Sequence, residues 1–191
     1  NNTKHKDAAW KVGRDASNTT AILTGLHVEM GNLLGATGNT EQQQFHYQEA
    51  AKLANASGDQ GALGRISAAI GTMHLKNGQP DSALIMLRYA ITASEKVGNV
   101  KYISTLMNEM GRVYIQKNRF DSASVYLYTA EGMAFETDHL SSLVETHKIL
   151  TNYYIQQGRK DSSLFYAQMS LDEVMSVDRE ANLGIVYENL F

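Results

Sequence analysis

Cysteine is absent from this chain of 191 residues, and proline occurs only once. Without cysteine there are no disulfides, thiol nucleophiles or thiolate metal sites, and the redox compartment is left open. The longest apolar run, from Ala83 to Leu87, is far shorter than the ~20 residues of a membrane-spanning helix, so we expect a soluble segment. No signal peptide is visible, and a cytoplasmic and a periplasmic location are equally open.

A large excess of charge of one sign is also missing. The 17 basic and 20 acidic side chains give a net charge of −3, and like charges do not gather in long runs. The segment therefore lacks the basic footprint that nucleic acid or anionic lipid requires, and we expect neither as a partner. Apolar residues make up 43% and charged residues 19%, which is the balance of a globular protein rather than of a disordered one.

A repeat with a period of 40 residues runs through the sequence. Gly31, Gly71 and Gly111 each follow an apolar residue, and turns followed by an acid recur at the same interval. The only proline, Pro80, lies at one of these turns, where a missing N–H costs little. The small residues of the second half of the unit, expected where helices touch, are Ala50, Ala83, Ala90, Ala123 and Ala130.

The turns divide each unit into two helices of about 17 residues with apolar residues at helical spacing. Because one pair of helices cannot cover its apolar stripe alone, the units must stack, and the sequence predicts an all-α solenoid. The ends cut through a repeat and indicate a fragment of a larger protein. The predicted units are 19–58, 59–98, 99–138 and 139–178, with the second helix of a preceding unit at 1–18 and the first helix of a following one at 179–191.

This pattern resembles the tetratricopeptide repeat (TPR) family. Its series of apolar residue, Gly, aromatic, Ala, Leu and Ala is met in full by Met110, Gly111, Tyr114, Ala123, Leu127 and Ala130. Tyr154 takes the aromatic position of a later unit, whereas Gln43 departs from the pattern in the first. The resemblance implies a right-handed superhelix of helix-turn-helix units. The 40-residue length, with the Asp81-Ser82-Ala83 phrase, resembles the long-repeat subclass in sensory regions of signalling proteins from Bacteroidetes-like bacteria.

The resemblance also implies a binding module whose concave groove is lined by one side of the first helices. Amide and cationic side chains suit an extended peptide, since amides pair with a backbone and Arg grips a carboxylate. A solvated face without a ligand is the equally open alternative. The predicted partner-binding residues are Asn32, Thr72, Lys76, Asn108, Arg112, Gln116, Lys148, Asn152 and Gln156.

Histidines give no sign of catalysis or metal binding. His27 and His147 occupy equivalent repeat positions, and His74 stands where Tyr114 and Tyr154 stand, so we expect them in or near the core. Neither a metal-ligand spacing nor a phosphate-binding or nucleophile motif occurs in the sequence. We therefore expect no enzymatic activity, no cofactor and no metal.

The predicted function is a protein- or peptide-binding module, serving as the sensory or interaction region of a bacterial signalling or transcription-regulatory protein. The alternative is a constitutive structural adaptor, or a co-chaperone-like scaffold, that does not switch. The exposed terminal helices are in addition candidates for a homodimer interface.

Overall fold

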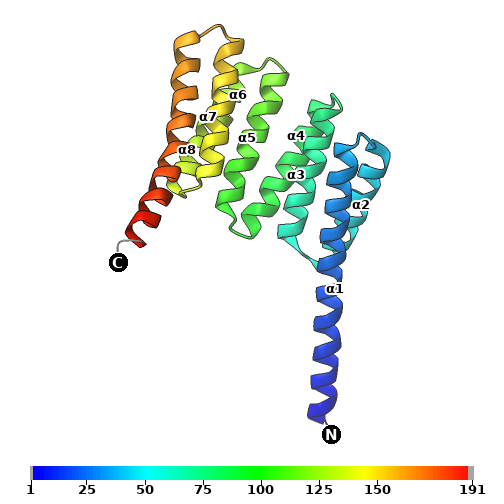
Figure 1. Ribbon diagram of the computed structural model, residues 1–191. Coiled ribbons are helices and arrows are strands. Elements are labelled where there is room, and N and C mark those ends of the chain that lie inside the picture. The colour runs from blue at the N-terminus through cyan, green and yellow to red at the C-terminus, as the bar shows by residue number, and fades with distance from the viewer. Residues whose placement is uncertain (1, 189–191) are drawn as a thin grey trace. The chain divides into compact units, whose positions relative to one another are not determined.

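The computed structural model describes the backbone of residues 2–188 and the side chains of residues 18–176 (Figure 1). Over this part of the chain it has eight helices and no strand, which confirms the all-α prediction. The helices are α1 (Asn2–Ala36), α2 (Thr40–Ser57), α3 (Gln60–Lys76), α4 (Pro80–Lys96), α5 (Val100–Gln116), α6 (Phe120–Glu136), α7 (Leu140–Gln156) and α8 (Lys160–Glu188).

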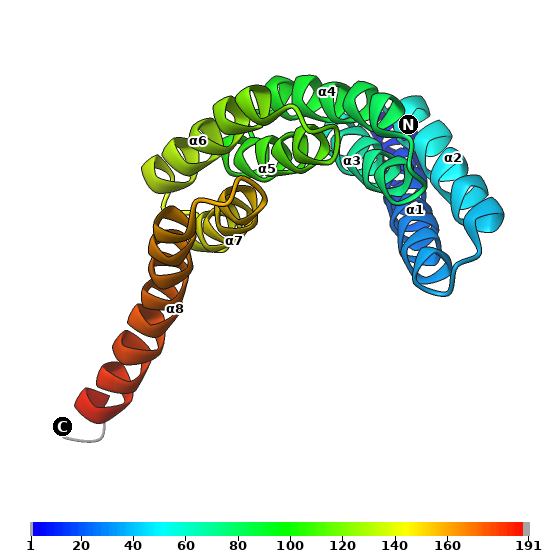
Figure 2. The ribbon, with the colours of Figure 1, turned by 90° about the horizontal axis from the view of Figure 1, so that it is seen from above.

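The chain forms two compact units, Asn1–Gly98 with helices α1–α4 and Asn99–Phe191 with helices α5–α8. Helices that follow each other in the sequence form the pairs α1–α2, α3–α4, α5–α6 and α7–α8. In the first unit the two pairs contact each other mainly through α2 and α3, and in the second unit mainly through α6 and α7. Seen from above, the first unit has α1 and α3 in one layer and α2 and α4 in the other (Figure 2). We call these the first-helix layer and the second-helix layer. Within the second unit, α5 with α7 and α6 with α8 likewise form two layers (Figure 2).

Every twentieth residue from 38 to 158 has a left-handed backbone. Five of these residues are glycines, and the other two are Asn118 with φ 54° and Asp138 with φ 47°. Asn and Asp tolerate this region better than other side-chain-bearing residues do. The chain thereby leaves each helix and enters the next after two or three residues, as the sequence predicted.

Hydrogen bonds close the helix ends at these turns. Beyond the left-handed residue, the N–H of Asn39 bonds the carbonyl of Leu34 at 2.9 Å, which satisfies a terminal carbonyl. At the next helix start, the carboxylate of Asp59 accepts from the N–H of Ala62 at 2.8 Å. Pro80 is the first residue of α4, where its missing N–H has no helical partner to lose.

The small residues of the repeat pack where the helices approach most closely. Ala50, Ala90 and Ala130 are completely buried, as are Ala83 and Ala123. The repeat glycines Gly31, Gly71 and Gly111 face large side chains of the paired helix: a Cβ at Gly111 would stand 2.5 Å from Cδ2 of Leu127. Both observations agree with the predicted repeat positions, and Tyr114 and Tyr154 are buried at the aromatic position.

The two end helices are longer than the repeat predicts, with 35 residues in α1 and 29 in α8. The expected helix boundaries near 18 and 178 are not found, because α1 and α8 continue through Asn18 and Asp178. Asn and Asp do form such turns at 118 and 138, so the residue type at 18 and 178 permits a turn but does not require one. The side chains of 1–17 and 177–191 lie outside the described residues, and their assignment to partial repeats stays a prediction.

Candidate functional site

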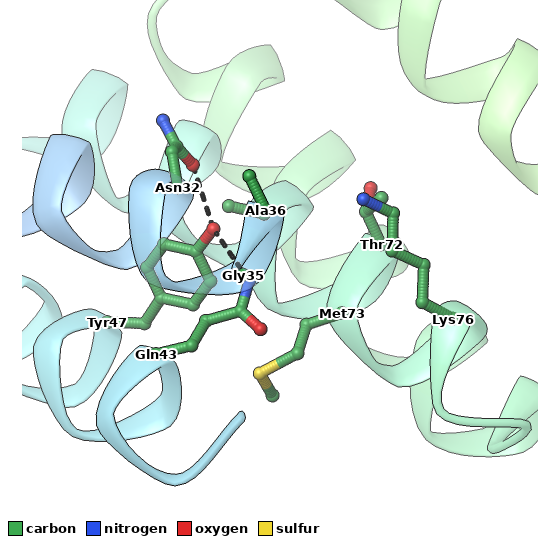
Figure 3. Close-up of a pocket in the computed structure, with 9 residues that line it drawn as sticks. Asn32, Gly35, Ala36, Gln43, Tyr47, Thr72, Met73 and Lys76 are labelled. Atoms are coloured by element: carbon green, nitrogen blue, oxygen red, sulfur yellow. Dashed lines mark hydrogen bonds between the residues drawn. The ribbon is translucent and has the colours of Figure 1, made fainter. Parts of the chain in front are cut away.

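A pocket of about 290 Å³ opens between α1, α2 and α3 in the first unit. It contains three of the predicted partner-binding residues, Asn32, Thr72 and Lys76, and these come from both first helices (Figure 3). We call it the α1–α3 pocket. Its lining residues are Asn32, Gly35, Ala36, Gln43, Tyr47, Ala69, Thr72, Met73 and Lys76.

The pocket lies beside two facing residues whose relative sizes are reversed in the first repeat. The larger residue is on the second helix here, whereas in later repeats it is on the first helix. On α2, Gln43 stands where later repeats have Ala83 and Ala123, and its amide is longer by several atoms. On α1, Gly35 faces it, where α3 has Leu75. A Cβ at Gly35 would stand 2.1 Å from Nε2 of Gln43, so only glycine leaves room for this amide. The exchange puts a polar group on the pocket wall where other repeats are apolar.

A chain of hydrogen bonds holds the polar side of the pocket. Tyr47 donates its hydroxyl proton to Oδ1 of Asn32 at 2.8 Å, and Nε2 of Gln43 donates to the Tyr47 hydroxyl at 3.4 Å. Figure 3 shows the amide nitrogen of Asn32 turned away from Tyr47. Tyr47 itself is buried, and the ring fits because Gly31 lies against it. Asn32 is therefore fixed with its donor group directed away from its own partner.

The opposite side of the pocket comes from α3. Thr72 is half-buried, Lys76 is exposed, and Met73 is buried below them. Hydroxyl, ammonium and amide donors thus stand on both sides of an open cavity (Figure 3). Such a set of donors suits carbonyl or carboxylate oxygens, and the apolar parts of Ala36 and Met73 give a surface for a small side chain.

In the second unit, the predicted cations are paired with acids of the chain itself. The guanidinium of Arg112 on α5 donates to Glu145 on α7, and its Nε lies 3.5 Å from Oε1 of Glu109. Lys148 binds the other oxygen of Glu145 at 2.8 Å. A carboxylate ligand would have to compete with Glu145 for both cations. The cations of this cluster are therefore less available to a ligand than the donors of the α1–α3 pocket.

Asn108 lies in the core, although the sequence placed it among the partner-binding residues. Its side chain is 1% exposed, and its amide donates to the carbonyl of Ser142 at 3.2 Å. Its Oδ1 accepts from the hydroxyl of Thr146 at 2.9 Å. This polar cluster joins α5 to α7, because Ser and Thr on α7 offer partners that an apolar neighbour would not. Asn108 is therefore a structural residue of the helix contact.

The remaining predicted residues of the second unit are accessible. Gln116 at the end of α5, and Asn152 and Gln156 on α7, all have exposed side chains. None of them lines the α1–α3 pocket or the two pockets at the turns 118–122 and 158–162, which are lined by the turn residues themselves. Their role in binding stays a prediction.

His147 is buried, as its repeat position predicts, but the sequence did not predict that it lies between two carboxylates. Its Nε2 lies 2.9 Å from Glu131 on α6, and its Nδ1 lies 3.0 Å from Glu173 on α8. Burial by itself lowers the pKa of His147, but the hydrogen bonds and charges of Glu131 and Glu173 outweigh it and raise the pKa above its ordinary value. A protonated ring can donate to both acids, so this contact ties three helices together.

His27 and His74 lie near the core, as their repeat positions predict, and Tyr166 lies beside His147. His27 is half-buried with Nδ1 3.0 Å from Nδ1 of His46, and His74 is partly buried and bonds Gln79. In the second unit, the ring of Tyr154 stacks on that of Tyr166. Burial raises the pKa of Tyr154 to about 12, with the Tyr128 hydrogen bond acting in the same direction.

The described part of the chain shows neither a metal site nor a membrane-spanning helix. Three or more His, Asp or Glu side chains do not converge on one point there as metal ligands would. Likewise, none of the helices in that part combines the length and the apolar character of a membrane span.

Comparison with known proteins supports the fold. No family model matches the sequence, and a search of curated proteins gives no match. Among solved structures, BtubC (BKLC) from P. vanneervenii is similar with a TM-score of 0.71 and 13% identity, over 92% of this chain and 77% of that one. The TPR-like repeats of a Podospora anserina protein described as a kinesin light chain give 0.64 and 13%, over 82% and 76%.

A third similar structure is the aspartyl phosphate phosphatase F of Bacillus subtilis, with a TM-score of 0.72 and 14% identity. The match covers 81% of this chain but 41% of the phosphatase. At these identities the similarity concerns the fold alone. The fold is thus that of TPR-like helical repeats, and the predicted resemblance to TPR proteins is supported at this level.

Gln43 and Gly35 line the pocket but were not among the predicted binding residues, although the sequence contains a signal for them. Gln43 breaks the repeat pattern, and in that pattern the break means only a weaker unit. The structure shows that Gln43 and Gly35 change together, one larger and one smaller than their counterparts. Comparing facing positions in pairs across the repeats, rather than single positions, identifies this site from sequence.

Proposed function

We propose that the protein is a non-catalytic module that binds an extended segment of a protein or peptide, with the α1–α3 pocket of the first unit as a binding site. The observation that carries the proposal is the set of donors around this pocket, where Asn32 is fixed by Tyr47 and Lys76 stands across the cavity. A peptide backbone offers carbonyl oxygens at regular spacing, and its side chains or terminus offer carboxylates.

The wider role that fits this module is the sensory or interaction region of a signalling or regulatory protein. The Asp-Ser-Ala phrase, at 81–83 and again at 121–123, and the 40-residue unit favour the bacterial long-repeat subclass for this role. In that case binding of the segment changes how the repeats pack, and the change reaches other parts of the protein.

A constitutive adaptor is the second candidate, and the cluster of Arg112, Glu145 and Lys148 favours it. These charges are already paired within the second unit, so a partner that covers them gains shape complementarity rather than new ion pairs. Small-angle scattering of the free and peptide-bound protein separates the two roles, because an adaptor keeps its scattering profile and a switching module changes it.

The direct test is selection of binding peptides from a displayed library of random 12-residue peptides. Peptides that bind the unaltered chain are then titrated against the double variant Asn32→Ala/Lys76→Ala by calorimetry. We expect at least a tenfold loss of affinity, because each lost hydrogen bond to a charged or fixed group is worth about 1–3 kcal/mol.

The matched control is Gln48→Ala/Lys52→Ala, which removes the same kinds of group from the exposed side of α2. Lys52 pairs with Glu49 at the surface, and such pairs contribute little to stability. Unchanged affinity in the control and a loss in the pocket variant support the proposal. Equal affinity in all three proteins, with intact helical signal, places the binding surface elsewhere and refutes the pocket as the site.

A further inference from the structure

An apolar face of α1 is left uncovered in the first unit. Leu26 is 57% exposed, and four other large side chains on the same helix are exposed with it. From position 23 onward they follow at alternating intervals of three and four residues, which is the spacing by which one helix presents a seam to another. The residues of this α1 face are Ile22, Leu23, Leu26, Met30 and Leu33.

The same repeat positions are covered on the other first helix of this unit. Ile66 on α3 corresponds to Leu26, and its side chain is 1% exposed. The covering surface is α2: Ala50 and Ala54 of α2 form one buried cluster with Ala62 and Ile66 of α3. Thus a first helix of this repeat is built to receive a second helix on the face that α1 leaves open.

Helix α8 leaves the matching face of a second helix open. Val174 is 48% exposed, whereas Ala54, at the same repeat position, is 0% exposed. Leu171 corresponds to Ala51, which packs against the α2–α3 cluster, and it too is exposed. The α8 face, Leu171 with Val174 and Met175, is therefore apolar and without a first helix on it in the described part of the chain.

We propose that α1 of one copy of this chain packs on α8 of a second copy in the same way as α3 packs on α2 within the first unit. In this contact α1 takes the place of α3, and α8 takes the place of α2. The proposal continues an interface that the chain already forms between its own repeats, and it does not depend on the α1–α3 pocket. The two faces differ, so the association is head-to-tail, and each added copy presents a new open face. The larger side chains of the end faces fill a somewhat wider helix spacing than the alanines of α2 do.

The test is analytical ultracentrifugation of the 191-residue chain over a wide range of concentration. We expect the average mass to rise with concentration beyond that of a dimer. Leu26→Glu removes the α1 face and Val174→Glu removes the α8 face, and each variant alone should stay monomeric. An equimolar mixture of the two should form dimers and nothing larger, because each variant retains the face that the other has lost.

Ile85→Glu is the control, since Ile85 is equally exposed on α4 but belongs to neither face. It should associate like the unaltered chain, and circular dichroism should show full helix content in all variants. An unaltered chain that is monomeric at every concentration overturns the proposal. So does a Val174→Glu variant that still associates, which indicates an α1–α1 contact, or a mixture of variants that stays monomeric.

Discussion

Gln43 lies against Gly35 so closely that Nε2 of Gln43 occupies the space a side chain at position 35 would need. In the third repeat the sizes are reversed, with Ile115 on the first helix and Ala123 on the second. The two residues act as one unit of packing, and the pocket depends on which helix carries the larger member.

Exchanging this pair should convert the first repeat into an ordinary one. Gly35→Ile alone overpacks the contact, and we expect it to destabilise the protein by about 1–3 kcal/mol. In the Gln43→Ala background the same change should cost much less, because the amide is gone. A double-mutant cycle by urea unfolding measures this coupling, and an unchanged cost in both backgrounds contradicts the packing relationship.

Two glycines within helices should respond in opposite directions to alanine. Gly111→Ala places a methyl group against the buried side chain of Leu127, so we expect a loss of about 1–3 kcal/mol. Gly132 on α6 has open space around its Cβ position, and Gly132→Ala should stabilise by about 0.5–1 kcal/mol through helix propensity. Thermal unfolding of both variants measures the difference, and shifts of the same sign would refute the close contact at Gly111.

The two asparagines Asn108 and Asn152 provide a matched pair for the corrected site. Asn108→Ala removes buried hydrogen bonds to Ser142 and Thr146, and we expect a loss of about 1–3 kcal/mol in the free energy of unfolding. Asn152→Ala changes an exposed side chain and should stay within about 0.5 kcal/mol of the unaltered protein. Denaturant unfolding decides, and similar small effects for both would mean that the Asn108 cluster contributes little.

His147 should make the second unit more stable at low than at high pH. Its pKa is raised by Glu131 and Glu173 in the folded state, so its stabilising effect is complete below the unfolded pKa of about 6.5 and disappears as the pH rises through the folded value. His147→Gln should therefore lose more stability near about pH 6 than near about pH 9.

Urea unfolding of both proteins at the two pH values tests this dependence. Glu173→Gln serves as the companion variant, because it removes one of the two carboxylates and should reduce the pH dependence without abolishing it. A His147→Gln loss of equal size at both pH values is the result that would contradict a raised pKa.

The sequence predicted the helices and turns well because they depend on local features. Glycine at 38, 58, 78 and 98 adopts the left-handed backbone of a turn without a steric cost, and small residues such as Ala90 mark helix contacts. The burial of Asn108 was not predictable from its repeat position, because this burial depends on Ser142 and Thr146 in the next repeat. His147 was expected in the core, but its two acidic partners come from other helices and follow no repeat pattern.

The end helices show the limit of repeat logic in another way. Asn18 and Asp178 stand at turn positions, and Asn118 and Asp138 form such turns within the second unit. The residue type alone thus does not decide between turn and helix. The packing of a second helix against the first decides it, and that information is not contained in the local sequence.

The uniform turns have a consequence for how such a chain can change. Because left-handed residues recur every twenty positions, 40 codons encode one complete packing unit that begins and ends at the same point of a turn. A tandem duplication or loss of 40 codons adds or removes a whole helix pair and leaves every neighbouring contact in register. An insertion or deletion inside a helix instead rotates the residues that follow it away from their helix contacts, so a whole repeat is the step in length that keeps these contacts in place.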